Sequence, residues 1–178
     1  MNNNLFRGFW KNPKGKSKIF INSKEITGDF VEGNLFVDEK QIEHEILIGY
    51  TNYRISYPII PSTAKRNTET LDCNNKIIFE GDIVHGDESV INQEFYGEIV
   101  YQDATFYVKS QNQGLWDINC ARDEIGFYDD ENNMHMPLHT FWQEQLEIVG
   151  NIFENPTMHN LTKISDLKNA NDALGDTK

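Results

Sequence analysis

Two histidines are the first residues in this chain whose types and spacing suggest chemistry. His135 and His139 are four residues apart, a spacing at which two imidazoles on one face of a helix can bind a metal. Pro137 stands between them, and no cysteine or carboxylate lies nearby at ligand spacing. Packing or surface histidines are therefore the better interpretation, and we expect no zinc site.

Carboxylates gather in two other places. The run Asp-Asp-Glu-Asn-Asn at 129–133 offers oxygen ligands, but it lacks the glycine and the closing glutamate of a calcium-binding EF-hand loop. Glu94, Glu98 and Asp103 could supply a pair for acid–base catalysis, although carboxylates at period two along a strand usually form its solvated face. No Gly-x-Ser-x-Gly, Gly-x-Gly-x-x-Gly, Walker or Cys-x-x-Cys pattern occurs. We therefore predict a protein that is not an enzyme and needs no cofactor.

Aromatic side chains are the remaining candidates for function, because they are enriched in protein interfaces. The chain has 3 Trp, 11 Phe and 7 Tyr, most of which should lie in the core. Trp116, Phe127 and Tyr128 stand instead in a polar and acidic segment, residues 111–136. We predict that one or two of these three bind a partner.

The elements that must position these side chains are predicted to be mainly β-strands, in an α+β protein overall. In residues 1–66 we expect a β-meander of two hairpins, the first with a basic loop at 11–16 and the second turning at Gly33-Asn34. Residues 39–50 are expected to be a strand entered by a short turn. Residues 51–75 lack apolar periodicity after Ile60, so we predict a connection between two lobes with the boundary near Arg66.

Residues 67–158 are predicted to form a small β-barrel like that of SH3 domains. Gly81 and Asp82 suit a tight turn that leads from an inward-facing Ile77-Ile78-Phe79 segment into a second buried strand at Ile83-Val84. A hairpin follows around Asp103-Ala104, then the acidic insertion near 111–136, one helical turn within 139–146 and a strand at 146–153. Residues 159–178 are expected to form a tail with a short, weak helix.

Charge is distributed unevenly along the chain, whose net charge is −12. Residues 1–66 have ten Lys or Arg against seven Asp or Glu, a net +3, whereas residues 67–160 have three against eighteen, a net −15. Either both parts are simply solvated, or the basic part docks on the acidic part of its own chain or of a neighbour. The acidic part makes direct binding of duplex DNA unfavourable, because such binding needs Lys and Arg to displace counterions.

Cysteine usage and hydropathy indicate the compartment. Cys73 and Cys120 have no partner motif, so we expect two reduced thiols. The N-terminus has neither a positive n-region nor an apolar h-region, and no window approaches the ~20 apolar residues of a membrane-spanning helix. We therefore expect a cytoplasmic protein without a membrane partner.

Three stretches together resemble the YopX family of phage and prophage proteins. They are Leu5-Phe-Arg-Gly-Phe-Trp10, Asp72-Cys-Asn-Asn-Lys-Ile-Ile-Phe-Glu-Gly-Asp-Ile-Val84 and Leu146-Glu-Ile-Val-Gly-Asn-Ile-Phe-Glu-Asn-Pro156. The resemblance covers residues 5–158 and implies an SH3-like barrel and a phage or prophage origin, but no activity, cofactor or catalytic residue. Asn74-Asn75 stands where the family usually has Asn-Gly, and Asn also adopts the left-handed conformation. We predict structural roles for Phe79, Gly81, Asp82, Val84, Gly97, Gly150, Asn151 and Pro156.

These observations predict a non-catalytic interaction module that forms homo-oligomers through its oppositely charged halves and binds further protein partners. The alternative is an acidic protein that imitates nucleic acid and inhibits a DNA-binding protein, motivated by the charge of −15 on residues 67–160.

Overall fold

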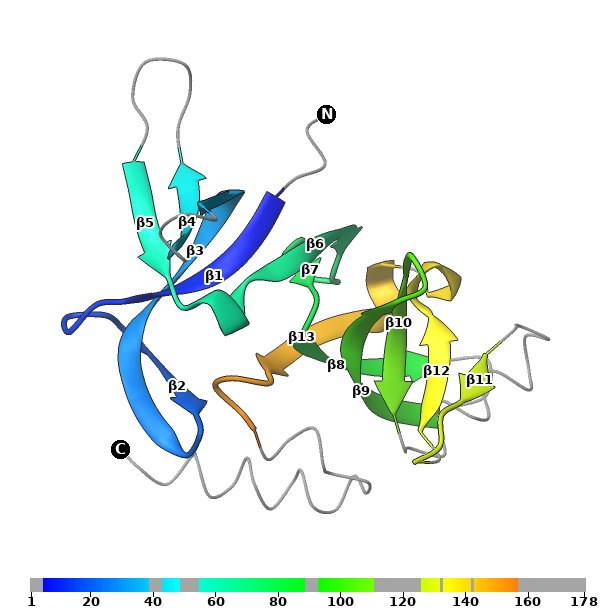
Figure 1. The fold of residues 1–178 in the computed structure, drawn as a ribbon. Coiled ribbons are helices and arrows are strands. Elements are labelled where there is room, and N and C mark those ends of the chain that lie inside the picture. The colour runs from blue at the N-terminus through cyan, green and yellow to red at the C-terminus, as the bar shows by residue number, and fades with distance from the viewer. Residues whose placement is uncertain are drawn as a thin grey trace. The chain divides into compact units, whose positions relative to one another are not determined.

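The fold is that of a computed structural model, which describes residues 5–38, 43–48, 55–88, 93–110, 126–131, 133–141 and 143–156 (Figure 1). The chain forms two compact units: Met1–Thr70 with Ile77–Glu80, and Leu71–Lys76 with Gly81–Lys178. Most of the predicted acidic insertion, with Trp116 and Cys120, and the predicted C-terminal helix lie outside the described residues. Within the described ranges, no helix is both long enough and apolar enough to cross a membrane.

The first unit is one antiparallel sheet in the order β2-β3-β4-β5-β1-β6-β7, with an additional pairing of β1 and β3 that curls it. The bounds of its strands are β1 Leu5–Lys11, β2 Ser17–Ile21, β3 Lys24–Asp38, β4 Glu43–Ile48, β5 Ile55–Ile59, β6 Lys65–Leu71 and β7 Ile77–Phe79. A 3-10 turn, η1 (Pro61–Thr63), joins β5 to β6. The prediction of a connection over residues 51–75 was therefore wrong for its described part, which contains two strands of this sheet.

Strand β3 corrects the prediction of two N-terminal hairpins. Its 15 residues are continuous through Gly33, which pairs with Phe6 of β1 instead of forming a turn. Gly28 pairs with Lys11 of β1 and with Ser17 of β2, so one long strand serves both neighbours. A Cβ atom at Gly28 would lie 2.2 Å from the Trp10 carbonyl oxygen. Gly28 therefore permits close backbone approach, and a glycine within a strand is not distinguished from a turn by sequence alone.

Residues 77–84 divide between the two units, with Ile77–Glu80 in the first and the residues from Gly81 onward in the second. This corrects the prediction that both sides of Gly81 belong to one barrel. Strand β7 lies in the first sheet, where the Thr68 hydroxyl donates to the Ile78 carbonyl at 2.8 Å and Arg7 lies 4.5 Å from the centre of the Phe79 ring. Strand β8 (Asp82–Glu88) lies in the second sheet. The strand character of both segments and the turn between them are as predicted.

The second unit is an antiparallel sheet in the order β11-β12-β10-β9-β8-β13. Its other strands are β9 Gln93–Gln102, β10 Thr105–Ser110, β11 Phe127–Tyr128, β12 Met134–Pro137 and β13 Leu146–Asn151, with 3-10 turns η2 Leu138–Thr140 and η3 Gln143–Gln145 before the last strand. Strand β13 returns to pair with β8, and the sheet curls into a half-barrel (Figure 1). This confirms the mainly β fold.

The core of the second unit lies inside the curl of its sheet. Val84, Phe95, Ile99 and Val108 have no exposed surface. Gly97 lies on β9 between two of them, and a Cβ atom there would come within 2.4 Å of Val108 Cγ1, so only glycine fits without movement. The β9–β10 hairpin turns at Asp103 and Ala104 with φ of 48° and 64°, which confirms the predicted turn. The half-barrel thus supplies a rigid wall to which β12 and β11 attach.

Candidate interaction site

The β11–β12 hairpin carries two of the three predicted partner-binding residues. Phe127 and Tyr128 form β11 and pair with His135 and Met134 of β12. The third residue, Trp116, lies outside the described residues. Strand β11 is an edge strand of the second sheet, so the β11–β12 hairpin lies at the edge of that sheet.

Asp129 holds the turn of this hairpin together. Its backbone N–H donates to the Asn133 carbonyl at 3.0 Å, which closes the loop. Its Oδ1 atom accepts from the Glu131 N–H at 3.0 Å and from both the backbone N–H and the side-chain Nδ2 of Asn133 at 2.9 Å. One carboxylate thus satisfies the donors of its own turn, as Asp and Asn side chains commonly do in loops.

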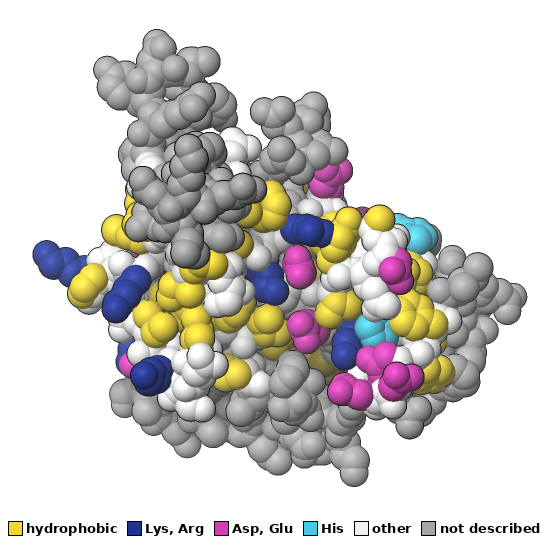
Figure 2. All heavy atoms as spheres, viewed as in Figure 1, with side chains coloured by type: hydrophobic (Ala, Val, Ile, Leu, Met, Phe, Trp, Pro, Cys, Tyr) yellow, Lys and Arg dark blue, Asp and Glu magenta, His cyan; other side chains and the backbone are white. Residues whose placement is uncertain are grey.

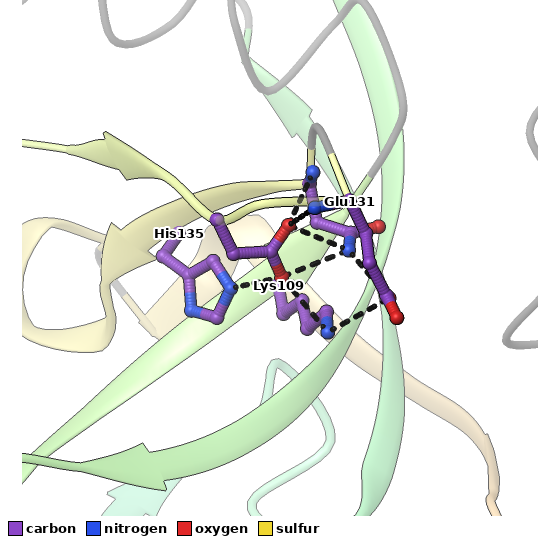
Figure 3. A network of polar contacts seen from close by, with 5 residues as sticks. Lys109, Glu131 and His135 are labelled. Carbon is purple, nitrogen blue, oxygen red and sulfur yellow. Dashed lines mark hydrogen bonds and ion pairs between the residues drawn. The ribbon is translucent and has the colours of Figure 1, made fainter.

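Two side chains from neighbouring strands complete the network (Figure 3). Lys109 of β10 and His135 of β12 are cross-strand partners, and both reach Asp129 Oδ2, from Nζ at 3.0 Å and from Nε2 at 3.1 Å. Glu131 Oε2 lies 3.9 Å from Lys109 Nζ. Burial acts to raise the pKa of Asp129, but the hydrogen bonds from Asn133, His135 and Lys109 outweigh it and hold the pKa well below its usual range. The carboxylate therefore stays charged and pins the hairpin to β10.

Aromatic contacts fix the other side of the hairpin. The Phe127 ring stacks on His135 with centroids 4.6 Å apart, and it meets Tyr107 edge to face at 5.3 Å. Phe127 is half-buried by these contacts, whereas His135 is 4% exposed. His135 Nδ1 is buried without a hydrogen-bond partner, so the Asp129–His135 pair has no open nitrogen with which to act on a substrate. This pair supports the hairpin and offers no accessible base.

Tyr128 is the side chain that this framework displays. It is 47% exposed, among the most exposed large hydrophobic residues of the described chain, and it directly precedes the turn. Asp130 and Glu131, also exposed, follow in that turn. In Figure 2, Asp and Glu side chains gather near a histidine and a lysine over the second unit. An aromatic ring framed by carboxylates on a rigid turn can bind a partner with an apolar, basic surface.

The sequence signal for this network was incomplete. The acidic run at 129–133 was considered as a source of oxygen ligands for calcium, although an Asp followed four residues later by Asn is typical of a turn that bonds its own backbone. Lys109 carries no such signal, because only the register of β10 on β12 brings it to Asp129. In the described ranges, no three His, Cys, Asp or Glu side chains converge as metal ligands do.

Comparison with models of known protein families identifies the family of this chain. The model of the YopX protein family matches residues 6–159, which is most of the sequence. This chain belongs to the YopX family. No curated protein and no solved structure matched it.

Within this YopX family member, the stretches that carried the resemblance serve both sheets: residues 5–10 and 77–79 lie in the first sheet, and the residues from Gly81 onward help to build the half-barrel. The Gly81 N–H donates to the Ile99 carbonyl at 2.7 Å, and the Gly81 carbonyl accepts from Ile152 N–H at 2.9 Å, with φ of 81° at Gly81. This glycine therefore joins β9 to the residues that follow β13. Asp82 and Val84 are fully buried on β8.

Asp72, from the second of the three stretches that carried the family resemblance, holds the loop before β7. Asp72 is fully buried and accepts from the N–H groups of Asn74, Lys76 and Ile148 at 2.9, 2.8 and 3.2 Å. Asn75 has φ of 60°, which confirms that asparagine replaces glycine at this turn.

Asn151 closes the end of β13, just after a register shift between Ile148 and Gly150. Its Oδ1 accepts from the N–H groups of Phe153 and Glu154 at 2.9 and 3.0 Å, before the exposed Pro156. These YopX family residues thus position the scaffold, and the hairpin residues described above form the candidate site.

Proposed function

We propose that this YopX family member is a phage or prophage accessory protein that acts in the host cytoplasm as a non-catalytic interaction module and self-associates. The observation that carries this proposal is the display of Tyr128 on a hairpin held by Asp129, Lys109 and His135. An anchor fixed in place before binding loses little conformational entropy, which favours affinity. The phage origin rests on the family resemblance.

The contrast of charge between residues 1–66 and residues 67–160, two sequence ranges that do not coincide with the two units, supports self-association. Residues 67–160 have a net charge of −15 and residues 1–66 a net charge of +3. In Figure 2, dark-blue Lys and Arg side chains lie over the first unit and magenta side chains gather over the second. Complementary potentials steer two copies toward one another and fix their orientation. Such attraction between exposed charges weakens as salt shortens the Debye length, from about 30 Å at 0.01 M to about 3 Å at 1 M.

Light scattering over a salt series tests the proposal on the full-length chain. We expect an oligomer at 20–50 mM salt that dissociates as salt rises to about 1 M. A molecular mass equal to that of the monomer at every salt concentration, with protein at 100 μM, would remove self-association from the proposal.

Imitation of nucleic acid is the second candidate function, favoured by the exposed carboxylates of the second unit. Glu94, Asp130, Glu131 and Glu147 are all exposed. An inhibitor of this kind competes with DNA for the basic site of its target, since both present a dense negative field. A pull-down from host lysate discriminates between the two candidates: DNA-binding proteins that elute with added duplex DNA favour the mimic, and recovery of only other proteins counts against it.

A further inference from the structure

A cleft of about 640 Å³ lies in the first unit beside the β2–β3 hairpin. Its apolar part is formed by Pro13, Ile21 and Ile26, and the aliphatic and charged parts of Lys11 and Lys24 line it as well. The volume falls within the ~300–1,000 Å³ range of small binding sites. The hairpin turns at Asn22 and Ser23 with φ of 50° and 62°, the primed turn that suits strand twist, so this part of the cleft is preformed.

The cleft carries positive charge. Glu25 is the one acidic residue of its lining, and its Oε1 atom lies 2.9 Å from Lys18 Nζ, so its charge is already paired. Lys11 and Lys24 are exposed, and within the described part of the chain no ion pair joins either of them to a carboxylate. The group that fits this site is therefore an apolar or aromatic side chain flanked by carboxylates.

The tip of the β11–β12 hairpin has that chemistry. Tyr128 is 47% exposed and is followed by exposed Asp130 and Glu131. We propose that the cleft of one copy receives this tip from a second copy of the chain, with Tyr128 against Ile21 and Ile26 and the two carboxylates near Lys11 and Lys24. This inference rests on the proposed self-association and names its two surfaces.

The two surfaces differ, so the contact is heterologous. Each copy keeps a free cleft when its tip is bound and a free tip when its cleft is bound, and such contacts extend into rings or open chains. We therefore expect the average mass to rise with protein concentration beyond that of a dimer. A mass that stays at that of the monomer at every concentration would instead mean that the cleft takes no second copy, and would overturn the inference.

Charge exchange between the two surfaces is the decisive experiment. Lys11→Glu/Lys24→Glu reverses the cleft, and Asp130→Lys/Glu131→Lys reverses the tip. Glu131 is 79% exposed and donates to Asp129 through its backbone N–H, which the replacement keeps. Its side chain makes a 3.9 Å ion pair with Lys109 and accepts a 3.4 Å hydrogen bond from Asn133 Nδ2. Sedimentation velocity at low salt should show each variant alone with an apparent dissociation constant raised about tenfold or more. An equimolar mixture should assemble again, because each reversed cleft then meets a reversed tip.

Two matched control variants reverse a charge of the same kind at positions outside the cleft and outside the hairpin tip. Lys14→Glu lies in the same basic loop outside the cleft lining, and Glu144→Lys is an exposed acid of the second unit away from the hairpin. Both should assemble as the unmodified chain does, and circular dichroism should show all variants folded. If the unmodified chain assembles and the cleft and tip variants do so equally well, this inference fails and self-association stands. If the unmodified chain stays monomeric, both fail.

Discussion

His135 Nε2 lies 3.1 Å from Asp129 Oδ2, although the two residues belong to opposite arms of the β11–β12 hairpin. The same carboxylate oxygen lies 3.0 Å from Lys109 Nζ on β10. Strands β10 and β12 and the turn after β11 therefore meet at one charged atom, and the exposed Tyr128 directly precedes Asp129 in sequence. The candidate interaction site owes its rigidity to this arrangement.

Replacing Asp129 with Asn tests that role. The amide keeps the shape but removes the charge that pairs with Lys109 and His135, and it presents a donor to other donors. We expect the free energy of unfolding to fall by about 1–2 kcal/mol, a modest loss because a quarter of the Asp129 side chain is exposed to screening solvent. Urea denaturation measures it. Asp130→Asn, at an exposed neighbour, is the matched control and should be near neutral.

Acidification should erase the difference between the unmodified chain and Asp129→Asn. The pKa of Asp129 is lowered in the folded protein, so its stabilisation is fully present above its unfolded pKa of about 4 and is lost as pH falls toward the folded value. The difference in unfolding free energy should stay constant from pH 7 to about 5 and shrink below about pH 4. A difference that holds unchanged to pH 2 would contradict this assignment.

Gly81→Ala tests the turn that joins the segments of the half-barrel. An alanine at φ of 81° is strained by its Cβ atom, and movement to relieve the strain would weaken the bonds to Ile99 and Ile152. We expect a loss of about 1–3 kcal/mol in the free energy of unfolding, measured by thermal denaturation. Gly150→Ala is the comparison, because among the described glycines positive φ occurs at Gly81 and not at Gly150. Equal losses of unfolding free energy in Gly81→Ala and Gly150→Ala would contradict the role assigned to the positive φ of Gly81.

Asp72→Ala tests the loop that precedes β7. It removes one buried carboxylate and leaves the N–H groups of Asn74, Lys76 and Ile148 without their acceptor. The expected loss of unfolding free energy is about 1–3 kcal/mol, because these partly buried donors would keep part of their desolvation cost without a partner. Cys73→Ser, at the exposed neighbouring position, should change stability by less than about 0.5 kcal/mol. A small effect at Asp72 would show that water replaces the carboxylate.

Tyr128→Ala tests the interface role itself. Loss of an exposed aromatic anchor should raise the dissociation constant of self-association about tenfold or more, while the melting temperature stays nearly unchanged. Tyr101→Ala is the control: Tyr101 is 37% exposed on the same unit and its ring lies 4.8 Å from Phe106. Equal association by both variants would place the interface elsewhere.

Local patterns predicted a large share of this fold. Alternating apolar residues identified most of the strands, and Asp103-Ala104 and Asn74-Asn75 marked turns that the backbone adopts with positive φ at Asp103, Ala104 and Asn75. The same patterns failed at Gly33, where a glycine within a strand resembles a turn, and around Gly81, where β7 and β8 join different sheets. The choice of sheet depends on pairing between distant segments, which no short window contains.

The candidate site shows the same division. Sequence by itself determined the mainly β class, the YopX resemblance, the contrast of charge and the presence of Phe127 and Tyr128 in an acidic segment, because composition, alternation and motif spacing are local. Only the tertiary structure decided that Phe127 packs on His135 while Tyr128 faces solvent, and that Lys109 neutralises Asp129. Those outcomes depend on the register of β10, β12 and β11, since a shift of one residue would turn each side chain to the opposite face.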